Sequence, residues 1–189
     1  TLLLAFAVQT AAAVTPEARL AALGLDLPAV SPAIANYVPA VRSGNLVFLA
    51  GQVARAPDGR IIAGKVGRDF TPEEGAGAAR LCALQLLAAL RAEIGDLAKV
   101  KRIVRVGGFV NCTESFTAQP QVVNGASDLL VAVFGEAGKH ARSAVGVPMV
   151  RRALGRVVDP AAHGAELLCQ RVFIAVGAPQ FPGHEGRCV

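Results

Sequence analysis

Aromatic side chains are scarce in this chain of 189 residues, which has no Trp and a single Tyr. Proteins that bind single-stranded nucleic acid commonly stack its bases on aromatic side chains along a basic groove. The formal net charge of +5 favours anionic partners in general, yet the basic residues are scattered along the chain. A solvated basic surface is the simpler interpretation, and nucleic acid is not expected as a partner.

Metal-binding motifs are also lacking. No CxxC pair or Cys/His cluster occurs, and the histidines share no metal-ligand spacing. The residues concerned are Cys82, Cys112, Cys169, Cys188, His140, His163 and His184. No metal site is expected. A reducing compartment is the simpler assumption, because nothing in the cysteine spacing suggests a disulfide framework.

Long apolar runs are missing as well. Residues 1–14 are apolar but too few to span a bilayer, so no membrane partner is expected. They resemble the apolar core of a secretory signal without its basic leading segment. A signal remnant, upstream read-through and an artificial boundary all remain open, and these residues stay outside the fold prediction. The expected location is cytoplasmic, with export as the alternative if residues 1–14 belong to a signal peptide.

The clearest pattern present is that of a long helix over residues 72–94. Thr71 is placed to cap it, Pro72 to open it and Glu74 to complete a capping box. Apolar residues recur every three to four positions, which predicts one buried face. That face comprises Ala79, Cys82, Ala83, Leu86, Leu87, Leu90 and Ile94.

Strands and shorter helices complete an α+β pattern. Short helices are predicted over 16–23 and 120–134, each ended by a glycine. The helices between strands imply crossovers, with two helices packed on one face of a sheet. The other face would be bare in a monomer, which favours assembly. Strands are predicted over 37–41, 46–50, 101–112, 142–147 and 167–176.

The character of the chain changes at Pro148. Arginines crowd the segment that follows without amphipathic order, and residues 177–189 hold several Pro and Gly that predict disorder. Three regions are therefore predicted: an apolar extension over 1–14, one domain over 15–147 and a divergent, partly disordered segment over 148–189. The abrupt change also resembles an out-of-frame reading of a GC-rich gene, a hypothesis that an intact frame at the locus would remove.

Six segments carry a resemblance to a known family: residues 35–41, 44–52, 73–90, 104–111, 123–130 and 138–147. Their order, and the Arg-Ser-x-Val sequence that begins a strand at Arg142, are its most specific features. Together they resemble the RidA/YjgF superfamily, also named endoribonuclease L-PSP, and in particular its longer, chorismate-mutase-like branch. The resemblance covers about residues 16–147.

The resemblance implies a trimeric barrel and a hydrolytic reaction. The family fold is a mixed β-sheet that carries two helices. Family members form homotrimers whose sheets surround a central barrel, with active sites in clefts between subunits. They hydrolyse reactive 2-enamines and 2-imines, made by pyridoxal-phosphate enzymes, to 2-keto acids and ammonia without a metal or organic cofactor. The implied partner is a small 2-imino or 2-keto acid, and the implied activity is that of a 2-iminobutanoate/2-iminopropanoate deaminase.

The resemblance also assigns four residues to a substrate site. Arg142 matches the arginine that binds the substrate carboxylate, for which a guanidinium offers two parallel donors. Tyr37 matches an aromatic that projects into the neighbouring subunit's cleft. Gly51 matches a glycine whose backbone approaches the ligand, and Asn124 a polar residue at the cleft edge. The plain alternatives are a surface arginine, an interface residue, a strand-end glycine and a structural helix asparagine.

The sequence departs from the deaminase pattern in three places. Ala50 and Ala144 stand where the family often has Ser and Cys. The strand that bears the water-activating Glu is not recognisable after Val147. Glu166 is the only carboxylate near the start of the last predicted strand, which makes it the catalytic candidate beside Arg142. Without a placed base, hydrolysis would lose about 10²–10⁴-fold.

Three functions therefore stay open. The first is an imine/enamine deaminase. The second is a regulatory trimer that binds small carboxylates without hydrolysing them. The third is an endoribonuclease, which ranks last because RNA binding favours stacking aromatics and a continuous basic groove, whereas this chain has one Tyr, no Trp and scattered charge.

Overall fold

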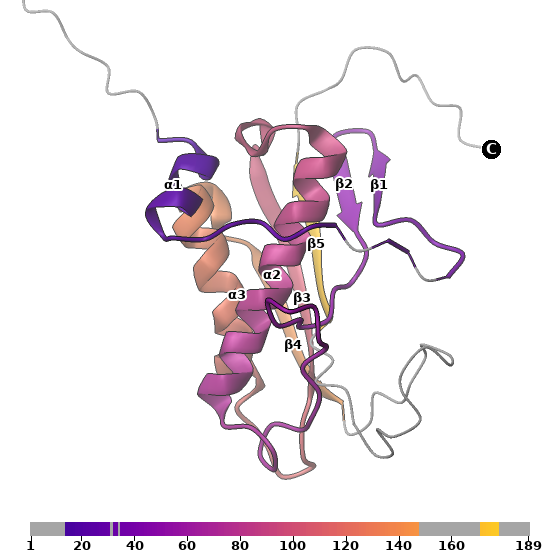
Figure 1. Ribbon diagram of the computed structural model, residues 1–189, viewed down its shortest axis with the longest axis vertical. Coiled ribbons are helices and arrows are strands. Elements are labelled where there is room, and N and C mark those ends of the chain that lie inside the picture. Colours follow the sequence, from indigo (N-terminus) through magenta and orange to yellow (C-terminus); the bar gives the residue numbers. More distant parts are fainter. Residues whose placement is uncertain (1–13, 31, 34, 148–170, 178–189) are drawn as a thin grey trace, which may run out of the picture.

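A five-stranded mixed β-sheet with helices on one face forms the centre of the structure (Figure 1). The computed structural model describes residues 14–30, 32–33, 35–147 and 171–177. The α+β class and the mixed sheet expected from the sequence are confirmed. The elements are α1 (Pro16–Ala22), β1 (Ala40–Ser43), β2 (Leu46–Leu49), α2 (Pro72–Ile94), η1 (Leu97–Lys99), β3 (Arg102–Asn111), α3 (Gln119–Phe134), η2 (Gly135–Gly138), β4 (Ala141–Val147) and β5 (Arg171–Gly177).

Helix α2 forms as its sequence predicts. The Thr71 hydroxyl accepts a hydrogen bond from the Glu74 backbone N–H at 3.2 Å, and the Glu74 carboxylate accepts one from the Thr71 N–H at 2.8 Å. Gly95, at a φ of 84°, ends the helix. Every residue of the predicted apolar face is at most 3% exposed. Local capping and core packing thus favour the same helix.

The sheet has the strand order β1-β2-β5-β3-β4. Strands β3 and β4 are parallel and joined through α3, whereas the other neighbouring pairs are antiparallel. Strand β5 enters the middle of the sheet between β2 and β3. The last predicted strand is therefore present from Arg171 onward, and its first part, residues 167–170, lies outside the described residues. The segment 148–170 and the residues after Gly177 also lie outside them.

The first hairpin is shorter than predicted. Strand β1 begins at Ala40 rather than at Tyr37, and it pairs with β2 from Ala40↔Leu49 to Ser43↔Leu46. Pro39 has no N–H to donate to a ladder, although its carbonyl accepts from the Ala50 N–H at 2.8 Å. The Tyr37 N–H bonds to the Ala35 carbonyl at 2.8 Å and forms a turn instead.

The two faces of the sheet differ sharply in exposure. The face under α2 and α3 is buried, with Val47, Ile103 and Val176 at most 1% exposed. The opposite face, here called the open face, leaves four large apolar side chains between 40% and 52% exposed in the single chain: Val41, Phe48, Val104 and Val145. These four side chains are therefore partly exposed to solvent in the single chain.

The N-terminal segment packs along the helical layer. The predicted helix α1 is present, and the Thr15 hydroxyl accepts a hydrogen bond from the Ala18 N–H at 3.1 Å. The Glu17 carboxylate accepts one from the Leu97 N–H at 2.9 Å and so connects α1 to η1. The connector after α1 crosses α2 on its way to β1 (Figure 1), and Leu25 and Leu27 pack against the core. Among the described helices, none is long and apolar enough to cross a membrane.

Candidate functional site

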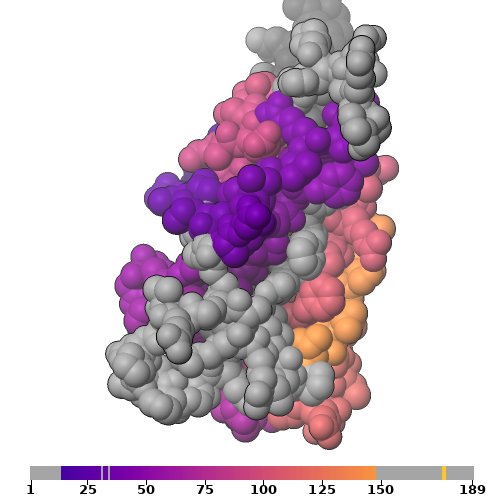
Figure 2. Space-filling view, turned by 90° about the vertical axis from the view of Figure 1, so that its right-hand side faces the viewer, coloured from indigo at the N-terminus to yellow at the C-terminus, as the bar shows by residue number. Residues whose placement is uncertain are grey.

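Arg142 lies on β4, the strand at one edge of the sheet. It pairs with Val106 of β3, and its side chain extends over the helix-covered face toward α3. One guanidinium nitrogen, Nη1, donates to Asn124 Oδ1 at 2.6 Å and to Ser127 Oγ at 3.2 Å. Arg142 and Asn124 are both exposed in the single chain. In Figure 2, part of the orange segment, which includes β4, lies at the molecular surface.

The Arg142 guanidinium keeps one edge available. Both hydrogens of Nη1 have acceptors on α3. Within the described residues, neither Nε nor Nη2 has a hydrogen-bond partner, and no carboxylate lies within 4.0 Å of the group. Other arginines are neutralised by carboxylates: Arg42 pairs with Glu93, and Arg60 with Asp58. Nε and Nη2 together form the fork that matches a carboxylate.

His140 contacts Ser127, one of the two α3 residues that bind Arg142. Its Nδ1 lies 2.6 Å from the Gly138 carbonyl oxygen, and its Nε2 lies 3.0 Å from Ser127 Oγ. Burial lowers the pKa of His140 below its ordinary value, and the nearby Arg142 charge adds to this, against the opposing hydrogen bond to Gly138. The imidazole is therefore neutral at physiological pH. A continuous chain of contacts runs from the Gly138 carbonyl through His140 and Ser127 to Arg142.

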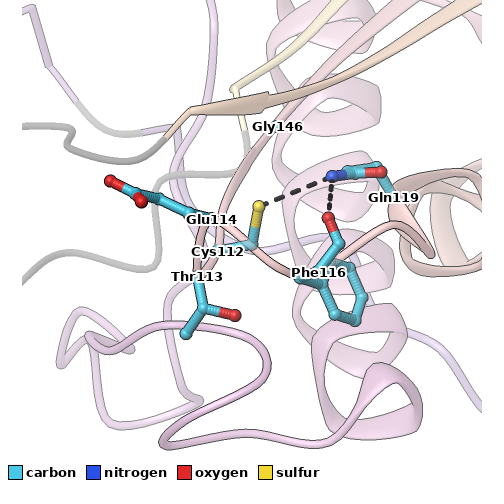
Figure 3. A pocket seen from close by; sticks show the side chains of 6 residues that line it. All are labelled: Cys112, Thr113, Glu114, Phe116, Gln119 and Gly146. Carbon is cyan, nitrogen blue, oxygen red and sulfur yellow. Dashed lines mark hydrogen bonds between the residues drawn. The ribbon is translucent and has the colours of Figure 1, made fainter.

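A small cavity lies further along β4 from Arg142, next to Gly146 (Figure 3). Its volume is about 260 Å³, and it opens between the end of β3, the start of α3 and Gly146 of β4. The Gln119 amide donates to Cys112 Sγ at 3.7 Å and to the Phe116 carbonyl at 2.6 Å. Gly146 follows Arg142 by four residues, about 13 Å along the strand, so the cavity and the guanidinium are separate features. The lining residues are Cys112, Thr113, Glu114, Phe116, Gln119 and Gly146.

Metal ligation has no candidate in this part of the molecule. Over the described ranges, no group of three or more His, Cys, Asp or Glu side chains is placed to hold a metal ion. The thiols of Cys82 and Cys112 are buried. Cys82 belongs to the core beneath α2, as predicted from its place on the apolar face of the helix.

Sequence and structure comparisons agree on the family. A family model described as "YjgF/chorismate mutase-like, putative endoribonuclease" matches residues 17–158. The chain belongs to this family. Protein TCP17 of Trypanosoma cruzi is 47% identical over 131 residues, which are 69% of this chain and 82% of that protein.

Two solved structures share the fold and about a third of the sequence. Protein Atu1372 of Agrobacterium tumefaciens, whose function is described as unknown, is 35% identical with a TM-score of 0.73, over 87% of this chain and 94% of its own. A "putative endoribonuclease" of Shewanella oneidensis MR-1 is 34% identical with a TM-score of 0.74, over 86% and 99% of the two chains. The YjgF-like resemblance inferred from the sequence is thus confirmed.

The structure does not bring all the residues matched to the YjgF family together in one chain. Tyr37 is 49% exposed and lies before β1, and Gly51 follows β2 by two residues. Strands β5 and β3 separate β2 from the strand that bears Arg142. With a strand spacing of about 4.8 Å, β2 and β4 lie about 14 Å apart. Arg142 and Asn124 form one group, whereas Tyr37 and Gly51 flank the β1–β2 hairpin at the opposite edge of the sheet.

Glu166, the predicted water-activating residue, lies outside the described residues. Strand β5, which it precedes by five residues, is antiparallel to β3 and starts opposite Phe109. That register places the start of β5 near the end of β3, at the same end of the sheet as the cavity of Figure 3.

Sequence reasoning missed Ser127 and His140. Two spacings could have indicated them. Asn124 and Ser127 are three residues apart on a helix, so they share one face. His140 precedes Arg142 by two residues, which places both side chains on the same side of an extended chain. Neither spacing is a known motif, and only the packing of α3 on β4 brings the two pairs into contact.

Proposed function

We propose that this protein binds a small 2-imino or 2-keto acid by its carboxylate at Arg142 and hydrolyses the imine to the keto acid and ammonia. The observation that carries the proposal is the Arg142 guanidinium itself. Two side chains of α3 hold its Nη1, while its Nε and Nη2 have no partner among the described residues. An exposed guanidinium held in this way is suited to a planar anion.

The carboxylate next to the C=N carbon explains why an arginine is used. Two parallel N–H donors fix the plane of the carboxylate, and the conjugated imine lies in nearly the same plane. Such a charge-assisted, bidentate contact contributes about 2–3 kcal/mol. It orients the C=N carbon so that water can attack from one face.

Hydrolysis needs a proton acceptor in addition to this anchor. Water adds to the C=N carbon while a base takes one of its protons and the imine nitrogen gains one, which gives a carbinolamine. The hydroxyl proton of this intermediate then passes to the amine nitrogen, and the C–N bond breaks to release ammonia and the 2-keto acid. We assign the base to Glu166, the only carboxylate near the start of the last predicted strand. Loss of that base should lower the rate by about 10²–10⁴-fold.

The site is completed by a second chain in this proposal. Tyr37 precedes β1 and Gly51 follows β2, and about 14 Å separates β2 from β4 in the same chain. The open face, with Phe48 and Val145 exposed, is an apolar surface suited to contact with other copies. A homotrimer in which Tyr37 and Gly51 of one subunit face Arg142 of the next satisfies both observations.

A non-catalytic, carboxylate-binding trimer is the second candidate. It is favoured by the absence of any described carboxylate within contact of Arg142, because binding needs the guanidinium alone. The endoribonuclease activity attached to one similar structure by its name is the weakest candidate, since the chain has few aromatic side chains on which bases could stack.

Replacement of the guanidinium tests the binding part of the proposal. Arg142→Ala should weaken the binding of pyruvate or 2-ketobutyrate by more than tenfold in calorimetry and leave the fold unchanged. Arg142→Lys keeps the charge without the fork and should also bind weakly. Arg91→Ala, on the exposed side of α2, is the matched control. Equal affinities of wild type and Arg142→Ala would remove Arg142 from the site.

An imine assay tests the hydrolytic part. An amino-acid oxidase generates the 2-imino acid, and a semicarbazide trap reports how much of it survives. The deaminase proposal expects faster loss of imine with the wild-type protein and a large drop with Glu166→Gln. A rate that survives Glu166→Gln would move the base elsewhere, and no rate beside tight keto-acid binding would favour the non-catalytic trimer.

A further inference from the structure

We propose that Ser127 and His140 are positioning residues that fix which edge of the Arg142 guanidinium faces the ligand. The inference rests on the proposed carboxylate site at Arg142. It adds that the orientation of this arginine is fixed by Asn124 and also by a hydrogen-bond relay, which runs from the Gly138 carbonyl through His140 and Ser127 to Arg142.

The direction of each hydrogen bond in the relay follows from chemistry. The Gly138 carbonyl can only accept, so the proton of His140 is on Nδ1, 2.6 Å away. In a neutral imidazole, Nε2 then carries a lone pair and accepts from the Ser127 hydroxyl at 3.0 Å. Because the hydroxyl has one proton, the Ser127 oxygen is left as an acceptor for Arg142 Nη1 at 3.2 Å.

Two acceptors on one nitrogen restrict the guanidinium plane. Asn124 Oδ1 takes one hydrogen of Nη1 and Ser127 Oγ takes the other. Asn124 and Ser127 lie one turn apart on α3, so both acceptors are held by the same rigid element. With Nη1 fully used, the Nε–Nη2 edge is the one left for a carboxylate. Without Ser127, Nη1 would have a single partner and the plane could rotate about that contact.

The surroundings of His140 maintain the neutral form that the relay needs. Its side chain is half-buried, and Arg142 on β4 is the cation that acts on it. Lys139 is engaged by Glu136 at 2.8 Å, and Asp128 of α3 is exposed. A protonated ring would place a second cation beside Arg142 and turn Nε2 into a donor, so the Ser127 hydroxyl would lose its acceptor.

Nitrogen NMR of the unliganded protein tests the relay without any assay of activity. Long-range ¹H–¹⁵N spectra should show His140 protonated on Nδ1, the tautomer less favoured by free histidine in water. The Nη hydrogens of Arg142 should be resolved from one another in the wild type and should average in Ser127→Ala. Protonation on Nε2 would overturn the relay, as would Arg142 signals that Ser127→Ala leaves unchanged.

Keto-acid binding tests the consequence for the site. Ser127→Ala should lower the affinity for 2-ketobutyrate by about tenfold, which is typical for loss of a hydrogen bond to a charged group. Ser127→Thr retains the hydroxyl and should keep most of the affinity. His140→Gln, whose amide oxygen can still accept from Ser127, should bind better than His140→Phe. Ser115→Ala, an exposed serine before α3, serves as the matched control, and circular dichroism checks that each variant is folded.

The outcomes separate this inference from the proposed function. A wild-type protein that binds no keto acid but shows the expected NMR signals would refute the proposed ligand and leave the relay standing. A wild type that binds, together with folded Ser127→Ala and His140→Phe variants of equal affinity, would refute the positioning role and leave Arg142 as the anchor.

Discussion

The helix-covered face and the open face of the sheet differ in how far their apolar side chains are buried within one chain. The helix-covered face is buried within one chain, where α2 and α3 pack on it and leave Val47, Ile103 and Val176 at most 1% exposed. The open face leaves Phe48 and Val145 about half exposed, and β4 carries Arg142, whose Nε and Nη2 have no partner among the described residues. One face therefore stabilises the chain, whereas the other face and the β4 edge are the surfaces proposed above for a second chain and a ligand.

This contrast means that stability and function can be changed separately. The core under α2 tolerates little change in volume, because well-packed interiors have no space to give. Substitutions at Val41, Phe48, Val104 and Val145 should cost little monomer packing, since these side chains are 40–52% exposed in the single chain. Substitutions on the two faces should therefore act on different measurements.

Gly125→Ala is expected to lower the stability of the helix-covered side most. A Cβ added there would lie 1.9 Å from the Ala76 carbonyl oxygen, a backbone atom of α2 that cannot turn aside. Gly125→Ala would force the two helices apart and should lower the free energy of unfolding by about 3 kcal/mol. Denaturant unfolding of wild type and variant measures this change.

Gly77 provides the control for that substitution. It is also a helical glycine and lies near Ala76 in the sequence, but a Cβ there would meet nothing within 4 Å. Gly77→Ala should raise the free energy of unfolding by about 0.5–1 kcal/mol, since alanine loses less backbone entropy in a helix. Similar effects at both positions would show that α2 and α3 are not in close contact at Gly125.

A substitution on the open face should change the oligomeric state rather than the free energy of unfolding. Phe48→Lys places a charge on the apolar surface and should convert the proposed trimer to a monomer in light scattering. The free energy of unfolding of the isolated chain should change by no more than about 0.5 kcal/mol. Val30→Lys, at an exposed apolar residue outside the strands, is the control. A wild type that is monomeric at micromolar concentration would count against the trimer and the two-chain site.

Local signals in the sequence were sufficient for the covered face. The capping box at Thr71 and Glu74, the apolar period of α2 and the terminating Gly95 each predict the same element, and the structure has it with the predicted ends. The start of β1 was misplaced because the apolar pattern continues through Tyr37 and Val38, whereas Pro39 cannot donate to the ladder.

The site was only partly predictable, because its contacts join distant parts of the chain. Arg142 and Asn124 were proposed from the family resemblance, and their hydrogen bond supports the pairing. Ser127 and His140 were missed, since a serine on a helix and a histidine before a strand carry no signal until α3 packs on β4. The insertion of β5 between β2 and β3 is likewise a long-range choice that no local pattern indicates.

The smallest expected effect concerns pH and the contact between α3 and β4. His140 has a pKa below its ordinary value of 6.5 in the folded chain, mainly because of burial. Below about pH 6.5 the unfolded chain therefore binds a proton that the folded chain resists, so stability falls as the pH drops toward the folded-state pKa. Above that range both states are neutral and His140 has no effect. His140→Gln removes the titration, and its unfolding free energy should fall less than that of wild type between pH 7 and 5 in paired denaturant titrations. Parallel pH profiles would show that His140 is as accessible to protons in the folded protein as in the unfolded one, and would remove the support that its neutral form gives to the relay behind Arg142.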